Sequence, residues 1–491
     1  MTLDIRAVKD NEARAPHRIL PVFSGGGDFA AVLPERWRSL AQETARIREF
    51  TGKTDTTLLL AYGAEQWLLT GLGEPAALTA PRFSEALARA YSELSRAGAR
   101  EITVCLPPGL PWQPRQTARL AGEALHMAGY AFRYYRSRES GPPAPSVELL
   151  SPAGAALADV ETGLREALAV GRGIDLTRDL INHPAAVATP GFVRDQAQTL
   201  AKELGLGFKV IQGEELAELG YGAIYAVGRG AENPPCLVAL EYGQPAPDRP
   251  TVALVGKGVT FDTGGLDIKP LSSMALMKKD MGGAAIVLGA LATAARLELP
   301  VHLVGVLGLA ENAVDARSYR PGDVLHSKLG LTIEVSSTDA EGRIVLADAL
   351  ALARDCNPAY LVDFATLTGA CRVALGKEVM GLFCDHAPLR TALEASAQAT
   401  GDHLWRLPLW QPYRKQLDSP VADLVNSTQD SFAGAIKAAL FLQAFAGEVA
   451  WAHLDCYAWS DGDSPLFPKG GSGVGVRLIV DLLSRLAEAR P

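Results

Sequence analysis

The chain has 491 residues and lacks the patterns that direct a protein to secretion or to a membrane. Its six cysteines are scattered without C-x-x-C spacing, which predicts buried free thiols in a reducing compartment. Residues 1–20 mix both signs of charge and contain no apolar core of a secretory signal. Residues 284–310 are the most apolar long stretch, but Arg296, Glu298 and His302 interrupt them, which predicts a buried helix and then a buried strand. These absences predict a cytoplasmic protein without a membrane span.

The sequence is also poor in the common motifs for nucleotides and zinc. It contains neither G-x-x-x-x-G-K-[ST] nor G-x-G-x-x-G, so a phosphate-binding loop is a weak interpretation. None of its eight histidines belongs to an H-E-x-x-H motif, and we expect each of them to be structural. The net charge of −8 disfavours a protein whose main task is to bind nucleic-acid phosphates.

What the chain does contain is typical of a large globular protein, with 48% hydrophobic and 21% charged residues. A stretch rich in proline, serine and glycine, residues 137–154, predicts a boundary between two parts. We expect a small N-terminal α/β domain over residues 1–153, a linking helix over 154–182 and a larger α/β domain over 183–491.

The larger domain is predicted to be an α/β sandwich with a central mixed sheet that carries the functional site. Its strand-like runs are apolar on both faces, which is typical of a sheet covered by helices on both sides. Helical patterns at 283–297 and 344–355 lie between some of these runs. Thr189, Pro190 and Gly205 fit the N-cap, first position and stop of a further helix. The strand-like runs are residues 208–212, 236–243, 251–258, 301–310, 331–336 and 359–365.

One dense cluster of charge is "TDAEGR", residues 338–343, directly before an apolar helical pattern. If this stretch is extended, Asp339, Glu341 and Arg343 project to one side of the backbone, because side chains two apart point the same way. Two carboxylates held that close repel each other unless a cation, a proton or an arginine lies between them. The alternative is a surface salt bridge near a helix start.

A second cluster follows the strand-like run at residues 251–255. Glycines on both sides of Lys257 allow the backbone to approach another group closely. Asp262 and Asp280 add to Asp339 and Glu341, which makes four carboxylates in glycine-rich surroundings. Hard divalent cations prefer such oxygen ligands, and two ions can share them. Lys257 can join them as a neutral amine if it loses its proton beside the cations.

Five motifs in the same order resemble the leucyl aminopeptidase family, the cytosol aminopeptidase or M17 family of two-metal peptidases. They are "VGKGVTFDTGG", "IKP", "MKKDMGGAA", "TDAEGR" and "DFATLTGAC". The resemblance covers residues 160–491, and the N-terminal domain resembles the family only in architecture. It implies an aminopeptidase that removes N-terminal residues, leucine-like ones by preference, through attack of a hydroxide that bridges two metal ions.

The resemblance also implies a role for each matching residue. Asp262 and Glu341 would bridge the two ions, which would be zinc, manganese or magnesium. Lys269 would stabilise the oxyanion, and Arg343 would hold a bicarbonate that acts as general base. The family pattern further implies peptide substrates and a homohexamer. The full sets are Lys257, Asp262, Asp280, Asp339 and Glu341 for the metals, and Met277, Thr366, Leu367 and Gly369 for the substrate.

Some residues depart from the family pattern or have plainer interpretations. Taken alone, Lys269 is a solvated lysine and Met277 is a core residue. Asp267 stands close enough in sequence to pair with Lys269 and weaken its role, and the loop at 314–316 differs in a way that affects substrate access. Two alternatives therefore stand beside the aminopeptidase: a scaffold or DNA-binding regulator that keeps the fold, which the acidic charge disfavours, and a dipeptidase of narrow specificity.

Overall fold

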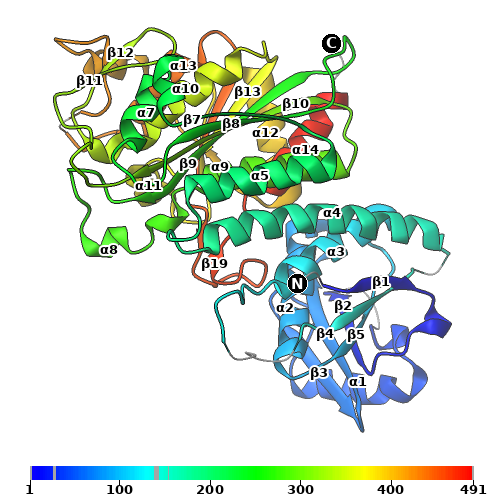
Figure 1. Ribbon diagram of the computed structural model, residues 1–491. Helices are drawn as coiled ribbons and strands as arrows, with labels where there is room; N and C mark the ends of the chain where they lie inside the picture. The colour runs from blue at the N-terminus through cyan, green and yellow to red at the C-terminus, as the bar shows by residue number, and fades with distance from the viewer. Residues whose placement is uncertain (1–2, 26–28, 138–142, 153, 429, 489–491) are drawn as a thin grey trace. The chain divides into compact units, whose positions relative to one another are not determined.

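The computed structural model describes residues 3–25, 29–137, 143–152, 154–428 and 430–488 (Figure 1). Its chain divides into two compact units. Unit 1 consists of Met1–Arg172 with Asp461–Lys469, and unit 2 consists of Gly173–Ser460 with Gly470–Pro491. The division falls inside helix α4 (Leu157–Asn182), so this helix belongs partly to each unit.

Unit 1 contains a six-stranded sheet in the order β1-β6-β5-β2-β4-β3. All its strand pairs are parallel except β3 with β4, which form an antiparallel pair. This agrees with the small α/β domain predicted from the sequence. The strands are β1 (Ile5–Val8), β2 (His17–Phe23), β3 (Thr57–Tyr62), β4 (Glu65–Gly73), β5 (Glu101–Cys105) and β6 (Ser146–Leu150), and the helices are α1 (Glu35–Ile47), α2 (Ala80–Arg96) and α3 (Pro114–Gly129).

Unit 2 is built on an eight-stranded mixed sheet in the order β15-β14-β17-β13-β9-β10-β8-β7. The four central strands are parallel to one another, whereas β8 runs antiparallel to β10, and β14 antiparallel to β17. The predicted mixed sheet is confirmed. Its strands are β7 (Gly207–Gln212), β8 (Cys236–Tyr242), β9 (Thr251–Asp262), β10 (His302–Asn312), β13 (Tyr360–Ala365), β14 (Met380–Phe383), β15 (Leu404–Arg406) and β17 (Ala450–Asp455).

One predicted strand of the central sheet lies elsewhere. Within residues 331–336, β12 (Thr332–Glu334) joins a separate three-stranded sheet, because its partners are the short strands β11 and β16. Two further two-residue strands pair with each other near the end of the chain. These short strands are β11 (Val324–His326), β16 (Leu424–Val425), β18 (Trp459–Ser460) and β19 (Gly470–Gly471).

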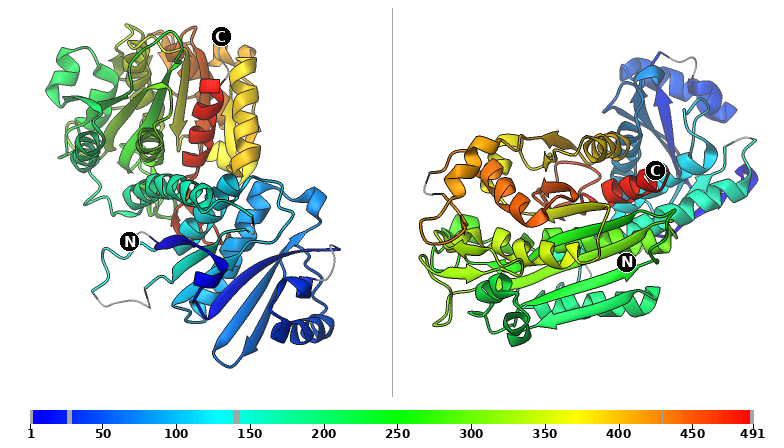
Figure 2. Two further views of the ribbon diagram at one scale, coloured as in Figure 1. Left: turned by 90° about the vertical axis from the view of Figure 1, so that its right-hand side faces the viewer. Right: turned by 90° about the horizontal axis from the view of Figure 1, so that it is seen from above.

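Helices cover both faces of the large sheet (Figures 1 and 2), as the doubly apolar strands predict. Strand β9 shows why: Val252 and Leu254 belong to one hydrophobic cluster, and Ala253 and Val255 belong to the other. The first cluster includes residues of α5 (Pro190–Leu204), α9 (Gly282–Arg296), α12 (Ala387–Thr400) and α14 (Val476–Glu488). The second includes residues of α6 (Glu214–Glu218), α7 (Gly222–Gly228), α10 (Glu341–Arg354), α11 (Gly369–Leu375) and α13 (Gly434–Ala446).

Several local predictions are confirmed. Thr189 Oγ1 accepts a hydrogen bond from the Phe192 amide at the start of α5, and Gly205 ends this helix with φ of 66°. The apolar stretch at 284–310 forms α9 and β10. The six cysteines are free thiols, of which five are buried and Cys356 is partly buried. Among the described residues, no helix is long and apolar enough to cross a membrane.

The first turn of α9 packs directly on the backbone of the large sheet. A Cβ atom on Gly283 would lie 2.0 Å from the carbonyl oxygen of Phe364 in β13, and one on Gly256 would lie 2.5 Å from Cα of Ala284. Side chains at these positions would push the helix away from the sheet. The glycine beside Lys257 therefore permits a helix backbone, and not a phosphate, to approach this strand.

This packing predicts that Gly283→Ala destabilises unit 2 by about 1–3 kcal/mol, because the added methyl group overpacks a backbone contact. The matched control is Gly191→Ala, at the second position of α5, where the nearest atom to the new Cβ lies at 3.7 Å. The control should be neutral or slightly stabilising, since alanine favours helix. Thermal unfolding of both variants checks this, and equal melting temperatures would contradict it.

Candidate metal centre

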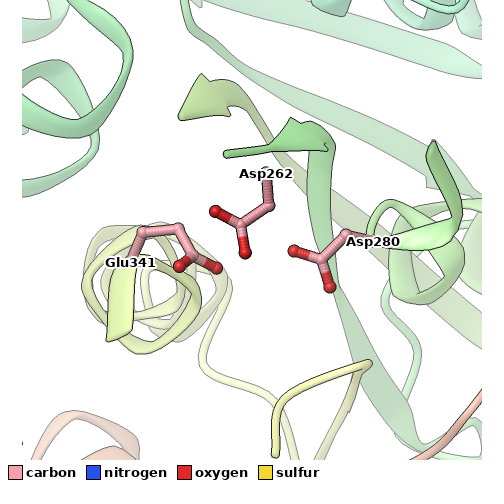
Figure 3. Close-up of side chains that lie close together, drawn as sticks. All are labelled: Asp262, Asp280 and Glu341. Carbon is pink, nitrogen blue, oxygen red and sulfur yellow. The ribbon is translucent and has the colours of Figure 1, made fainter. Parts of the chain in front are cut away.

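Three buried carboxylates meet where β9 ends and two helices begin (Figure 3). Asp262 is the last residue of β9, Asp280 lies two residues before the start of α9, and Glu341 is the first residue of α10. One oxygen of each lies within 4.8 Å of one oxygen of each of the others. Three negative charges this close in a buried site repel one another strongly unless positive charge lies between them.

Two lysines supply part of that positive charge. Lys257 Nζ lies 2.8 Å from Asp280 Oδ2 and 2.8 Å from Glu341 Oε1. Lys269 Nζ lies 2.7 Å from Asp262 Oδ2 and also forms an ion pair with Asp339. The Lys257 side chain fits beside α10 because Gly342 has no side chain: a Cβ there would lie 2.6 Å from Nζ.

The two lysines do not balance all of the negative charge. Burial raises the pKa of Asp262 to about 7, and repulsion from Glu341 and Asp280 acts in the same direction. Burial likewise raises the pKa of Asp339 to about 6. For Glu341 the effect of burial is opposed and outweighed by Lys257 and Lys269, so its pKa is lowered. At neutral pH the cluster can therefore take up a proton or bind a further cation.

One buried carboxylate oxygen of this cluster lacks a hydrogen-bond donor among the described residues. Glu341 Oε2 is buried without any such partner, whereas Asp280 Oδ2 has the ammonium group of Lys257 at 2.8 Å. Buried acceptors without a donor are costly, whereas hard divalent cations bind such oxygens readily. The chemistry of these residues thus fits a divalent metal ion.

The backbone around Asp339 is not extended, so the expected reason for convergence is wrong. Thr338–Ala340 form a 3-10 turn and α10 begins at Glu341. Asp339 pairs with Lys269, and Glu341 contacts Lys257. Arg343 instead donates from Nη1 to the Asn426 carbonyl oxygen at 2.6 Å, while its Nε has no partner among the described residues. Helical rotation, and not strand alternation, gives each side chain its own partner.

Asp267 does not pair with Lys269, contrary to the concern raised by the sequence. Its carboxylate accepts a hydrogen bond from the Thr338 amide at 2.8 Å, and its own amide donates to Thr338 Oγ1 at 2.9 Å. Asp267 therefore ties its loop to the 3-10 turn. Lys269 keeps its contacts with Asp262 and Asp339.

Sequence reasoning missed three residues that hold the centre in place. Asn312 ends β10 opposite Asp262 in the strand register, and its Nδ2 donates to Asp262 Oδ1 at 2.8 Å. Asp455 ends β17 and accepts from Thr368 Oγ1 at 2.6 Å and from the Leu367 amide at 3.1 Å. A polar residue at the end of a buried parallel strand was the available signal for both.

The third missed residue, Asn426, lies outside the central sheet and gave no such signal. Its Nδ2 donates to the Ser337 carbonyl oxygen at 2.7 Å, and its Oδ1 accepts from the Ser336 amide at 2.8 Å. The carbonyl oxygen of Asn426 also accepts the hydrogen bond from Arg343. Asn426 therefore fixes the segment that precedes α10.

A cavity of ≈ 540 Å³ opens beside the carboxylates. The predicted substrate residues all line it, namely Met277, Thr366, Leu367 and Gly369. Arg343 and the loop at 314–316 do not line this cavity in the described chain. Thr366 connects the cavity to the carboxylates, because its Oγ1 donates to Asp280 Oδ1 at 2.7 Å and its carbonyl oxygen accepts from Lys257 at 3.3 Å.

Comparison with known proteins places both parts of the chain in one family. Residues 175–480 match the catalytic domain of the cytosol aminopeptidase family, and residues 19–139 match its N-terminal domain. The likeness of the N-terminal part thus extends to its sequence, beyond the architecture expected from the motifs. A probable cytosol aminopeptidase of Geobacter sp. (strain M21) is 44% identical over 90% of this chain and 91% of its own. One of Pseudomonas fluorescens (strain SBW25) is 40% identical over the whole of both.

Solved structures give the same result. The cytosol aminopeptidase of Coxiella burnetii is 36% identical with a TM-score of 0.84, over 98% of this chain and 99% of its own. The bottromycin maturation enzyme BotP in complex with Mn is 36% identical with a TM-score of 0.85, over 96% and 100%. A variant of tomato leucine aminopeptidase is 30% identical with a TM-score of 0.88, over 98% and 96%. The chain therefore belongs to the cytosol aminopeptidase family and is a metal-dependent aminopeptidase.

Proposed function

We propose that this aminopeptidase removes N-terminal residues from peptides with two divalent metal ions held by Lys257, Asp262, Asp280, Asp339 and Glu341. The observation that carries the proposal is the buried group of three carboxylates, in which Glu341 Oε2 has no donor among the described residues. Zinc, manganese and magnesium are the candidate ions. The complex of BotP with Mn, a relative over nearly the whole chain, favours manganese for a first test.

When bound, such ions polarise a peptide carbonyl and lower the pKa of water toward neutrality. The chain's own residues would supply the remaining functions. In Figure 3 the carboxylate of Asp262 lies between those of Glu341 and Asp280. By the family pattern, Asp262 and Glu341 would be ligands of both ions, with Lys257 and Asp280 on one of them and Asp339 on the other. The Thr366–Gly369 loop, held by Asp455, would present its backbone to the peptide.

Lys269 would stabilise the negative charge that develops on the substrate carbonyl oxygen. It lines the cavity, and its ammonium group already lies beside Asp262 and Asp339. Burial alone would lower its pKa, but the carboxylates Asp262, Glu341 and Asp339 outweigh this and raise the pKa, so the group stays charged at neutral pH. A fixed positive charge in a buried site favours an oxyanion without reorganisation.

Arg343 would hold a bicarbonate ion that acts as general base. Burial lowers the pKa of Arg343 to about 10, which still leaves the guanidinium charged at neutral pH. Its Nε donor lacks a partner among the described residues, so a donor is available to an anion.

The remaining expectations rest on the family resemblance. A leucine-like preference would come from an apolar wall that includes Met277, which lines the cavity. A homohexamer, a cytoplasmic location and the boundaries 1–153, 154–182 and 183–491 also stay proposals. Comparison of dipeptides with longer peptides separates a general aminopeptidase from a dipeptidase.

Removal of metal and of its ligands tests the two-ion proposal. Protein stripped of metal should not hydrolyse leucine p-nitroanilide, and Mn²⁺ or Zn²⁺ should restore the activity. Asp339→Ala and Glu341→Ala should lower kcat/KM by about a hundredfold or more, because even groups behind the ligands contribute ten- to a hundredfold. Asp355→Ala, an exposed carboxylate at the end of α10, is the control. Full activity of folded Glu341→Ala, or of stripped protein, would refute the proposal.

Replacement of Lys269 tests its role as electrophile. Lys269→Gln should lower kcat by about a hundredfold with little change in KM, because the interaction develops only in the transition state. Lys209→Gln, an exposed lysine on β7, should leave both constants unchanged. Steady-state kinetics with leucine p-nitroanilide measures the effect. A rise in KM at unchanged kcat would assign Lys269 to ground-state binding instead.

A further inference from the structure

One part of the cavity wall carries positive charge that the proposed mechanism does not use. Tyr457, two residues after the strand end at Asp455, lines the cavity together with Lys279 and Arg372. We call these three residues the tyrosine wall. Lys279 Nζ lies 4.3 Å from the centre of the Tyr457 ring, and Arg372 Cζ lies 5.6 Å from it. Lys377 Nζ lies 5.9 Å from the same ring.

Within the tyrosine wall, Arg372 is the cation without a fixed counter-charge. It is an exposed residue in the last turn of α11, and no carboxylate of the described chain forms an ion pair with it. Lys279 differs, because it is buried and is attracted to the neighbouring Asp280. Lys279 and Arg372 carry the same charge and lie against the same ring, so together they raise the positive potential in this part of the cavity. This potential disfavours the binding of a further cation there.

The tyrosine ring also restricts where the guanidinium can lie. A cation over an aromatic face is held by the ring quadrupole, which lowers the entropy that the long arginine side chain would lose on binding a ligand. A planar guanidinium presents parallel N–H donors that match the two oxygens of a carboxylate. Arg372 is therefore well placed to bind a carboxylate in this cavity.

The same cavity is lined by Asp280 and Glu341, so one ligand can contact both kinds of charge. Its volume of ≈ 540 Å³ is of the size that accommodates a short peptide. A peptide whose amine end lies at the carboxylates and their metal ions would reach the tyrosine wall with its first side chain or, if it is short, with its C-terminus.

We propose that Arg372, held on the ring of Tyr457, binds a carboxylate of the substrate and so favours peptides that carry one in reach of the cavity. The inference rests on the proposed function, since it places the reacting bond at the carboxylate cluster. The carboxylate has two possible sources, an acidic side chain on the first residue or the C-terminus of a dipeptide. Arg372 thereby determines specificity and takes no part in the chemical step.

Two substrate pairs that differ only in this carboxylate test the proposal with full-length protein supplied with Mn²⁺. The first pair is glutamyl and glutaminyl p-nitroanilide, and the second is Leu-Ala and Leu-Ala amide. We expect kcat/KM for the charged member to exceed that for the neutral member by about tenfold in at least one pair, mainly through KM. In Arg372→Gln this ratio should fall to about one, and in Arg372→Lys it should be intermediate, because the charge remains without the planar donors.

The ratio within each pair cancels any general loss of activity or of folded protein. Arg249→Gln removes an exposed arginine that does not line the cavity, and it should leave both ratios as in the wild type. A loss confined to the first pair assigns Arg372 to an acidic side chain, and a loss confined to the second assigns it to the C-terminus. Wild-type ratios near one, or ratios unchanged in Arg372→Gln, overturn this inference alone. No turnover of any of the four substrates overturns the proposed function and this inference with it.

Discussion

The mutual repulsion of Asp262, Asp280 and Glu341 is the interaction on which the rest of the site depends. Two unit charges at 4 Å interact by about 4 kcal/mol even at an effective dielectric constant of 20. Lys257 and Lys269 offset part of this cost through contacts of 2.7–2.8 Å. The remainder is visible in the pKa of Asp262, which burial and its neighbours raise to about 7. The most direct explanation for carboxylates that are held this close in a folded chain is that they form a cation site.

The fold makes this arrangement possible by bringing backbones unusually close together. Helix α9 starts against β9 and β13 because Gly256 and Gly283 have no side chains. Gly342 leaves room for the buried side chain of Lys257 in the same way. Asn312 and Asp455 then fix the centre from the ends of two further strands of the parallel core of the sheet. The proposed catalytic groups thus lie on or directly beside helices and strands, as a geometry of this precision requires.

The cavity combines this centre with a wall of different charge. The carboxylates, the lysines and the loop that Asp455 holds belong to the family's catalytic domain, and we propose that they carry out peptide hydrolysis. The proposed selectivity for a carboxylate depends on the surrounding wall, where Lys279 and Arg372 lie against the ring of Tyr457. A hydrolytic centre and a separate specificity wall in one cavity allow the same chemistry to act on different substrates when the wall changes.

The sequence by itself determined the α/β class, the two-part organisation and the caps of α5, because apolar periodicity and capping residues act between near neighbours. It also supplied the candidate ligands, through its two charged clusters and the motifs that contain them. It did not predict that β12 joins a separate small sheet, that Thr338–Ala340 form a 3-10 turn, or that Asp267 binds Thr338 and leaves Lys269 to Asp262. Asn312 lies 50 residues from Asp262, and Tyr457 is still more remote in sequence from Lys279. Only the tertiary structure decided these contacts, because strand order, register and helix rotation set which distant side chains meet.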